Sequence, residues 1–164
     1  MKGASLPAFV FLGLALLGAA APRLQAQSSS VSNFSALLQI PAGGSSPSLG
    51  FVVATPTEFL IRAVGPSLSS FGIPNPVAAS SLKIFNSSGV DVLNEPNVRP
   101  IPVDWSFVYA SVGAFPIGAG DADAHATILL GPGAYTVVAQ DSSGSGGAVL
   151  LEVYVNPALG QTVD

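Results

Sequence analysis

Residues 124–155, AHATILLGPGAYTVVAQDSSGSGGAVLLEVYV, contain the pattern that decides the fold class. Three short runs at 124–130, 135–139 and 148–155 are separated by Gly131-Pro132-Gly133 and by a segment rich in serine and glycine. Runs of this length, bounded by turn residues, are typical of β-strands. The last run is apolar at nearly every position, which indicates a strand that is buried on both of its faces or lies between subunits.

The same pattern continues through the rest of the chain. Further strands are predicted at 33–40, 49–54, 59–64, 82–85 and 90–93. The turn Asn86-Ser87-Ser88-Gly89 predicts a hairpin between the last two runs, because Asn and Gly tolerate positive φ. About eight short strands at this spacing predict an all-β fold, an antiparallel β-sandwich of the jelly-roll or Ig-like (immunoglobulin-like) type.

Two stretches have a different pattern and predict short helices. Pro66 to Phe71 fits one helical turn, with proline near its start and Gly72 after its end. Asp104 to Val112 fits a longer helix, in which Asp104 is the N-cap and apolar side chains share one face. We expect both helices to close an end of the sandwich.

The first 26 residues predict a secretory signal peptide. A positive start at Lys2 precedes an apolar run from Leu6 to Ala21, and Ala26 supplies a small residue for cleavage. The alternative is a retained membrane anchor, for which the run is short. We therefore expect a secreted protein, extracellular or on the cell surface, with residues 27–164 forming a single β-sandwich domain. No later segment is long and apolar enough to span a membrane.

The expected mature chain carries few reactive side chains. Without Lys2 and Arg23 it has three basic residues against nine acidic ones, a net charge of −6, with one histidine and no cysteine. The acidic balance argues against nucleic acid as a partner. Catalysis needs clusters of reactive groups in perturbed environments. The composition therefore favours a structural protein over an enzyme and predicts no cofactor.

Several segments together carry a resemblance to a known family. They are NFSALLQI (33–40), GFVV (50–53), LIRAVGPSL (60–68) with FG (71–72) behind it, VGAFPI (112–117), GPGAYTVVAQ (131–140) and GGAVLLEVY (146–154). The chain resembles a β-sandwich module of large secreted and surface proteins from Verrucomicrobia-like environmental bacteria. The resemblance implies a structural or adhesive role. The chain departs from the family at residues 94–100, where members often carry a different loop.

Two charged residues interrupt apolar strands. Arg62 lies within 59–64 and Glu152 lies within the last strand. Because an isolated buried charge is costly, each needs a partner. We expect Arg62 to form a structural ion pair, with Glu152 as the first candidate partner and Glu58 as the second. The alternative is that both side chains point to solvent on the outer face.

Asp121, Asp123 and His125 alternate along the chain, so a strand projects all three to one side. The two aspartates are weak candidate ligands for Ca²⁺, against the alternative of a solvated start of a strand. A Ser-His-Asp hydrolase would need His125 beside an activated serine, and no serine lies in a Gly-x-Ser-x-Gly elbow.

Trp105, Phe107 and Tyr109 offer two further alternatives. Exposed, they would form a platform for stacking a glycan; packed inward, they would form a plug of the core, which the spacing favours. The platform would make the protein an extracellular binding or adhesion module for a glycan or another surface partner.

The first strand is a candidate for assembly. Phe34, Ala36, Leu38 and Ile40 make one side of it apolar, and an unpaired strand invites addition to another chain. We expect the partners to be copies of the protein itself, joined by strand addition into a filament, sheath or matrix. The alternative is a monomer in which this strand pairs within its own chain.

Overall fold

The computed structural model describes residues 31–94, 104–117 and 122–156. The expected leader (1–26), most of the 94–100 loop and Asp121 lie outside these ranges. The described part contains seven strands: β1 (Asn33–Ile40), β2 (Ser48–Val53), β3 (Thr57–Val64), β4 (Ser80–Asn86), β5 (Ala124–Leu130), β6 (Gly133–Asp141) and β7 (Gly147–Val155).

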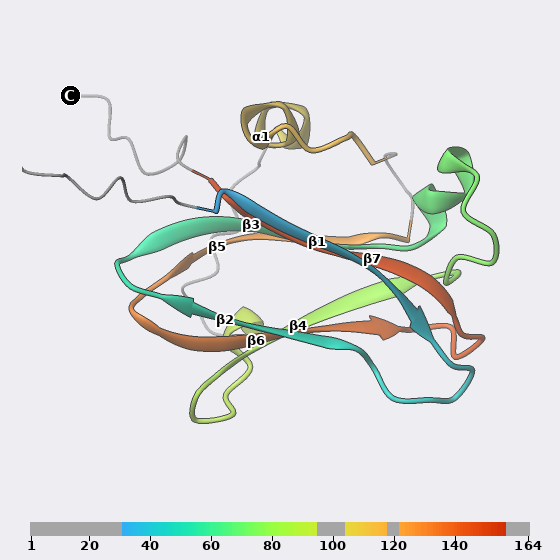
Figure 1. Ribbon diagram of the computed structural model, residues 1–164, viewed down its shortest axis with the longest axis horizontal. Coiled ribbons are helices and arrows are strands. Elements are labelled where there is room, and N and C mark those ends of the chain that lie inside the picture. The colour runs from blue at the N-terminus through green and yellow to red at the C-terminus, as the bar shows by residue number, and fades with distance from the viewer. Residues whose placement is uncertain (1–30, 95–103, 118–121, 157–164) are drawn as a thin grey trace, which may run out of the picture. The chain divides into compact units, whose positions relative to one another are not determined.

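The strands form two stacked antiparallel sheets, as predicted (Figure 1). One has the order β1-β7-β3-β5 and the other the order β2-β6-β4. Consecutive strands always lie in opposite sheets, so no two neighbours in sequence pair with each other. In the immunoglobulin arrangement several consecutive strands do pair. Of the two predicted types, the alternation is that of a jelly roll, which usually has eight strands, of which the described residues form seven.

The main core lies between the two sheets. Its side chains come from alternate positions of the strands, because successive residues of a strand point to opposite faces. In β3 and β7 these positions include Ile61, Ala63, Val149 and Leu151, all fully buried. From the other sheet Ile84 and Val137 pack against them. This interior is apolar throughout, as the sequence pattern predicts.

The strand predicted at 90–93 is not formed. The turn at 86–89 is present, with the Gly89 N–H donating to the Asn86 carbonyl at 2.9 Å, but the chain then makes only one bridge, Phe85 to Asp91. Residues Val92–Asn94 form a short 3₁₀ helix, η2. The Asp91 carboxylate accepts from the Leu93 N–H, so a local side-chain bond replaces the strand ladder.

Both predicted helices are present. The 3₁₀ helix η1 (Pro66–Phe71) ends at Gly72, whose φ of 75° is left-handed. The helix α1 (Trp105–Val112) begins at Asp104, which accepts from the N–H groups of Ser106 and Phe107. The expected position of α1 was wrong. It lies over the face of the four-stranded sheet that points away from the other sheet, not over an end (Figure 1).

Candidate functional site

The two isolated charges meet on the covered outer face of the four-stranded sheet. Arg62 on β3 and Glu152 on β7 are direct neighbours in the strand register. Both are buried, at 0% and 3% exposed. They lie on the outer face, as the solvent-exposed alternative supposed, but α1 and residues 114–117 exclude the solvent there.

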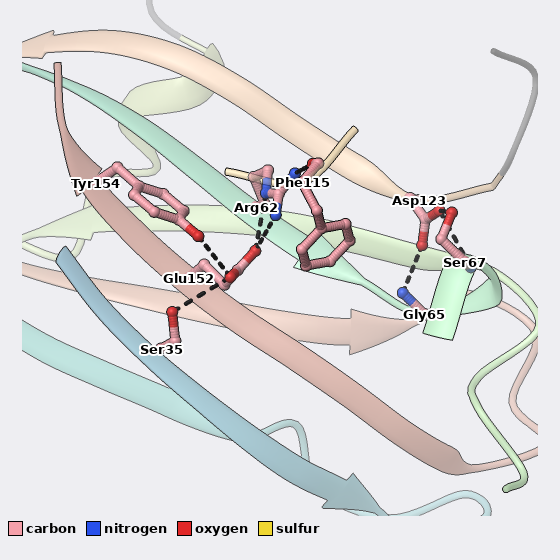
Figure 2. A network of polar contacts seen from close by, with 8 residues as sticks. All are labelled: Ser35, Arg62, Gly65, Ser67, Phe115, Asp123, Glu152 and Tyr154. Carbon is pink, nitrogen blue, oxygen red and sulfur yellow. Dashed lines mark hydrogen bonds and ion pairs between the residues drawn. The ribbon is translucent and has the colours of Figure 1, made fainter. Parts of the chain in front are cut away.

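The polar atoms of this pair are almost fully used (Figure 2). Arg62 Nε and Nη2 donate to Glu152 Oε2 at 2.8 and 2.5 Å, and Nη1 donates to the Phe115 carbonyl at 2.6 Å. The other carboxylate oxygen, Oε1, accepts from the Tyr154 hydroxyl at 2.7 Å and from Ser35 Oγ at 3.2 Å. A buried ion pair is stable only when its remaining donors and acceptors are satisfied in this way.

Aromatic rings enclose the guanidinium group. Its central carbon lies 4.3 Å from the ring centre of Phe115, 5.1 Å from that of Tyr109 and 5.7 Å from that of Tyr154. Arginine stacks favourably on such rings because the ring face is electron-rich. Burial raises the pKa of Tyr109 to about 12, and the nearby Arg62 opposes this increase. Burial also raises the pKa of Tyr154, with a further contribution from its bond to Glu152.

This cluster, the Arg62 cluster, consists of Ser35, Arg62, Tyr109, Phe115, Glu152 and Tyr154. Its members come from β1, β3, β7, α1 and the segment after α1. We call α1 and residues 114–117, which pack on the outer face of the sheet, the cover. The cluster joins the cover to the sheet, because the bond to the Phe115 carbonyl connects residues 114–117 to β3. The role of the cluster is therefore structural, because it holds residues 114–117 on the sheet.

Asp123 closes the turn between β3 and η1. Its carboxylate accepts from the Gly65 N–H at 2.5 Å, and from the N–H and hydroxyl of Ser67. Gly65 is required there, since a Cβ would lie 2.4 Å from a methyl of Val77. Both Asp123 oxygens thus bind the turn. Among the described residues, no group of three or more His, Cys, Asp or Glu side chains is placed to hold a metal ion.

His125 lies beside the Arg62 cluster, opposite Arg62 in the register of β3 and β5. Its ring packs edge-on against Trp105, with 4.1 Å between ring centres, and lies 6.0 Å from Tyr109. Burial, and then the neighbouring Arg62, lower its pKa below 6.5. Its Nδ1 has no hydrogen-bond partner in the described part of the chain. The serine contact that a Ser-His-Asp hydrolase needs is not formed among these residues.

The three aromatic residues of α1 do not form a platform. Tyr109 is buried in the second core, between α1 and the sheet, and Trp105 stacks against it and packs edge-on against His125. Only Phe107 points outward, at 58% exposed. An open cleft of about 510 Å³ lies nearby, between β4 and β5, and His125 and Asp123 contribute to its lining.

The predicted assembly strand pairs within its own chain. β1 is antiparallel to β7, and Phe34, Ala36, Leu38 and Ile40 lie opposite Val153, Leu151, Val149 and Gly147. Ile40 is buried in the main core and Leu38 packs against it. Leu38 and Ile40 therefore contribute to the core of their own sandwich, whereas Phe34 is 46% exposed. The other edge of β1 has no partner strand among the described residues.

Sequence reasoning missed Ser35, Phe115 and the structural use of Asp123. Ser35 and Phe115 contact the ion pair from segments far from both charges, and Phe115 does so through its backbone carbonyl. No local pattern marks such a contact. The sequence did contain a signal that the sheet has a cover. A charge within an apolar strand, such as Arg62, needs polar partners when it is buried, and a further layer of the structure can supply them.

Comparisons with known proteins find a distant structural similarity and no match among family models or curated sequences. The chain is similar to a solved structure, the pre-peptidase C-terminal domain of a collagenase from Bacillus anthracis, at 16% identity and a TM-score of 0.46. The match covers 74% of this chain and 88% of that domain. At this distance the likeness says nothing about what this chain binds or does.

Proposed function

We propose that this protein is a secreted structural module of the cell surface or extracellular matrix, and that it associates with copies of itself by strand addition. In this role the fold acts through its shape and cohesion and catalyses no reaction. The expected leader at 1–26 supports export. In the described residues no helix is long and apolar enough to cross a membrane.

The observation that carries the proposal is the outer edge of β1, which has no partner strand among the described residues. This strand has eight residues and contains no charge and no proline. Natural proteins usually protect such edges with lysine, proline, a bulge or a covering segment, because an open edge pairs with other chains. An open, uncharged edge of this length is therefore suited to pairing with another strand.

The reactive groups support the same proposal. Arg62 and Glu152 are held by each other and by the cluster around them, while both oxygens of Asp123 bind the turn at Gly65. The hydrogen bonds that these groups make are therefore contacts within the fold.

Light scattering and electron microscopy of the exported, purified chain test this function. We expect particles larger than one chain, in a concentration-dependent equilibrium. A protein that stays monomeric at every concentration would contradict the proposal. Removal of residues 1–26 should keep the protein inside the cell.

Deletion of β1 is not a suitable test of assembly. It would remove Ile40 from the main core and expose β7, so the fold and the edge would be lost together. Substitutions at exposed positions of β1 avoid this problem.

A further inference from the structure

The side of the sandwich formed by β1 and β2 has an unusual composition. β1 and β2 are the terminal strands of their sheets, and the opposite terminal strands, β4 and β5, contact each other. β1 and β2 therefore share one side. Residues 24–57, which include both strands and the loop between them, contain no Asp, Glu, Lys or Arg. This side also exposes Phe34, Leu37 and Val52, at 46, 51 and 78%.

The direction of the backbone groups of β1 follows from its pairing with β7. The Val155 N–H donates to the Ser32 carbonyl at 2.8 Å, and these residues face each other just beyond the Asn33–Tyr154 pair. In an antiparallel ladder the hydrogen-bonded pairs alternate. The even-numbered residues of β1 thus point their N–H and C=O groups toward β7. Asn33, Ser35, Leu37 and Gln39 point theirs out of the free edge.

The opposite side of the sandwich is less open. On β4 the Ser80 N–H donates to the Ala122 carbonyl at 2.8 Å, and the Asn86 N–H donates to the Val90 carbonyl at 3.0 Å. This strand also carries Lys83. β5 follows directly on Asp123, and Trp105 packs on its His125. Only the β1 side is long, uncharged and without a capping segment in the described part of the chain.

We propose that the partner at this edge is a second copy of the chain, and that two β1 strands pair antiparallel about a twofold axis at Ala36. The inference rests on the proposed function and specifies its contact. Two identical strands are self-complementary when antiparallel, because residue i of one faces residue j of the other and the reverse. When the axis passes through Ala36, Asn33 of one copy faces Gln39 of the other, and Ser35 faces Leu37. All four outward-pointing residues of each strand are then paired.

The distribution of charge allows a second copy of the chain to dock at this side. Without the expected leader each chain has three basic residues against nine acidic ones, a net charge of −6, so two copies repel each other except where charges are absent. The uncharged 24–57 segment supplies such a surface. Pairing there joins the two four-stranded sheets into one continuous sheet. A twofold contact also closes on itself, because it uses the same edge of both copies. It therefore gives a dimer as the basic unit.

Two leucines make a matched test. Leu37 and Leu129 are exposed, at 51 and 63%, and lie on the two edge strands of the same sheet. Leu37→Lys places a lysine near the same lysine of the second copy at the proposed contact. Leu129→Lys adds the same charge at the opposite edge, away from that contact. We expect light scattering to show dimers for the wild type and for Leu129→Lys, and monomers for Leu37→Lys at the same concentration.

Cysteine cross-linking tests the register independently, since the chain has no cysteine of its own. Ala36→Cys places two thiols opposite each other at the proposed axis, at a strand spacing compatible with a disulfide. We expect oxidation to give a covalent dimer. The control is Ala126→Cys on β5, which should remain monomeric on a reducing-agent-free gel. If Leu37→Lys fails to fold, the cross-link alone decides.

The outcomes separate the two proposals. A wild-type monomer at every concentration overturns both. Fibres or large oligomers that survive Leu37→Lys, or that dissociate with Leu129→Lys, overturn the twofold contact and leave the structural function standing. Dimers that Ala36→Cys does not cross-link overturn the register.

Discussion

Both faces of the four-stranded sheet are buried at its two middle strands, β7 and β3, but different interactions hold the neighbouring elements in place on each face. The inner face packs Ile61, Val149 and Leu151 against the other sheet. The outer face carries Arg62 and Glu152 beneath α1. Apolar packing on the inner face tolerates exchange among apolar side chains of similar volume, because the contacts do not depend on particular atoms. The outer face depends on particular atoms, since each polar group there must find its partner.

The largest expected effect comes from separating the ion pair. Glu152→Leu leaves the Arg62 guanidinium buried without its carboxylate, and we expect it to lower the free energy of unfolding by about 3–5 kcal/mol. Urea unfolding measures this change. The double variant Arg62→Met/Glu152→Leu should recover most of the loss, because an apolar pair of similar volume needs no polar partner.

Leu151 gives the matched comparison on the inner face. Leu151→Ala, one residue from Glu152, should lower the free energy of unfolding by about 2–5 kcal/mol through the cavity that it leaves.

The double variant Arg62→Met/Glu152→Leu decides the comparison. If it is no more stable than Glu152→Leu alone, the outer face needs its ion pair, contrary to this interpretation.

A smaller effect is expected at the turn between β3 and η1. Asp123→Ala leaves the Gly65 N–H without its acceptor and frees Ser67, and should lower the free energy of unfolding by about 1–3 kcal/mol. Asp141 is the matched control, because it accepts from the Ser143 and Gly146 N–H groups in an exposed loop. Asp141→Ala should cost less. Equal losses would mean that Asp123 has no special role in joining β5 to η1.

The smallest effect concerns pH and the cover. Since the pKa of His125 is lowered from 6.5 by burial and by Arg62, the folded protein favours the neutral ring. Its contribution to stability is present above pH 6.5 and is lost as the pH falls through the lowered pKa. Trp105, the one tryptophan of the chain, packs on this ring and reports its protonation by fluorescence quenching.

We expect the fluorescence of Trp105 to fall in a single step below pH 6.5, and the step to vanish in His125→Phe. Far-UV circular dichroism over the same range separates this local change from unfolding. A midpoint at or above 6.5 would contradict the buried, cation-facing position of the ring. Asp123, which directly precedes this strand, opposes the effect of Arg62 on the pKa of His125 and so limits the shift.

Local patterns predicted much of the fold correctly. The seven strands that form lie close to their predicted ranges, and η1 and α1 begin and end where proline, the Asp104 cap and the following glycines indicate. The strand at 90–93 was wrong, because Asp91 bonds to the backbone near it. The place of α1 was also wrong, because a helix signal contains no information about which surface the helix covers.

The candidate site shows the same limit. The isolated charges at Arg62 and Glu152 predicted a need for partners, but the sequence left Glu58 and solvent as alternatives. The pairing of β3 with β7 places the two charges side by side. Contacts with Ser35 and the Phe115 carbonyl depend on strand order and on the cover. Neither is encoded in the residues near the charges.

The sequence by itself determined the alternation of apolar residues, the turns, the helix caps and the scarcity of charge from residue 24 to 57, because each is a property of neighbouring residues. Tertiary structure alone decided that β1 lies beside β7 with one edge open, and that Arg62 and Glu152 share a closed space. The physical reason is that every strand offers the same backbone hydrogen bonds to any partner. Which strands pair is therefore settled only when all the apolar faces are buried together.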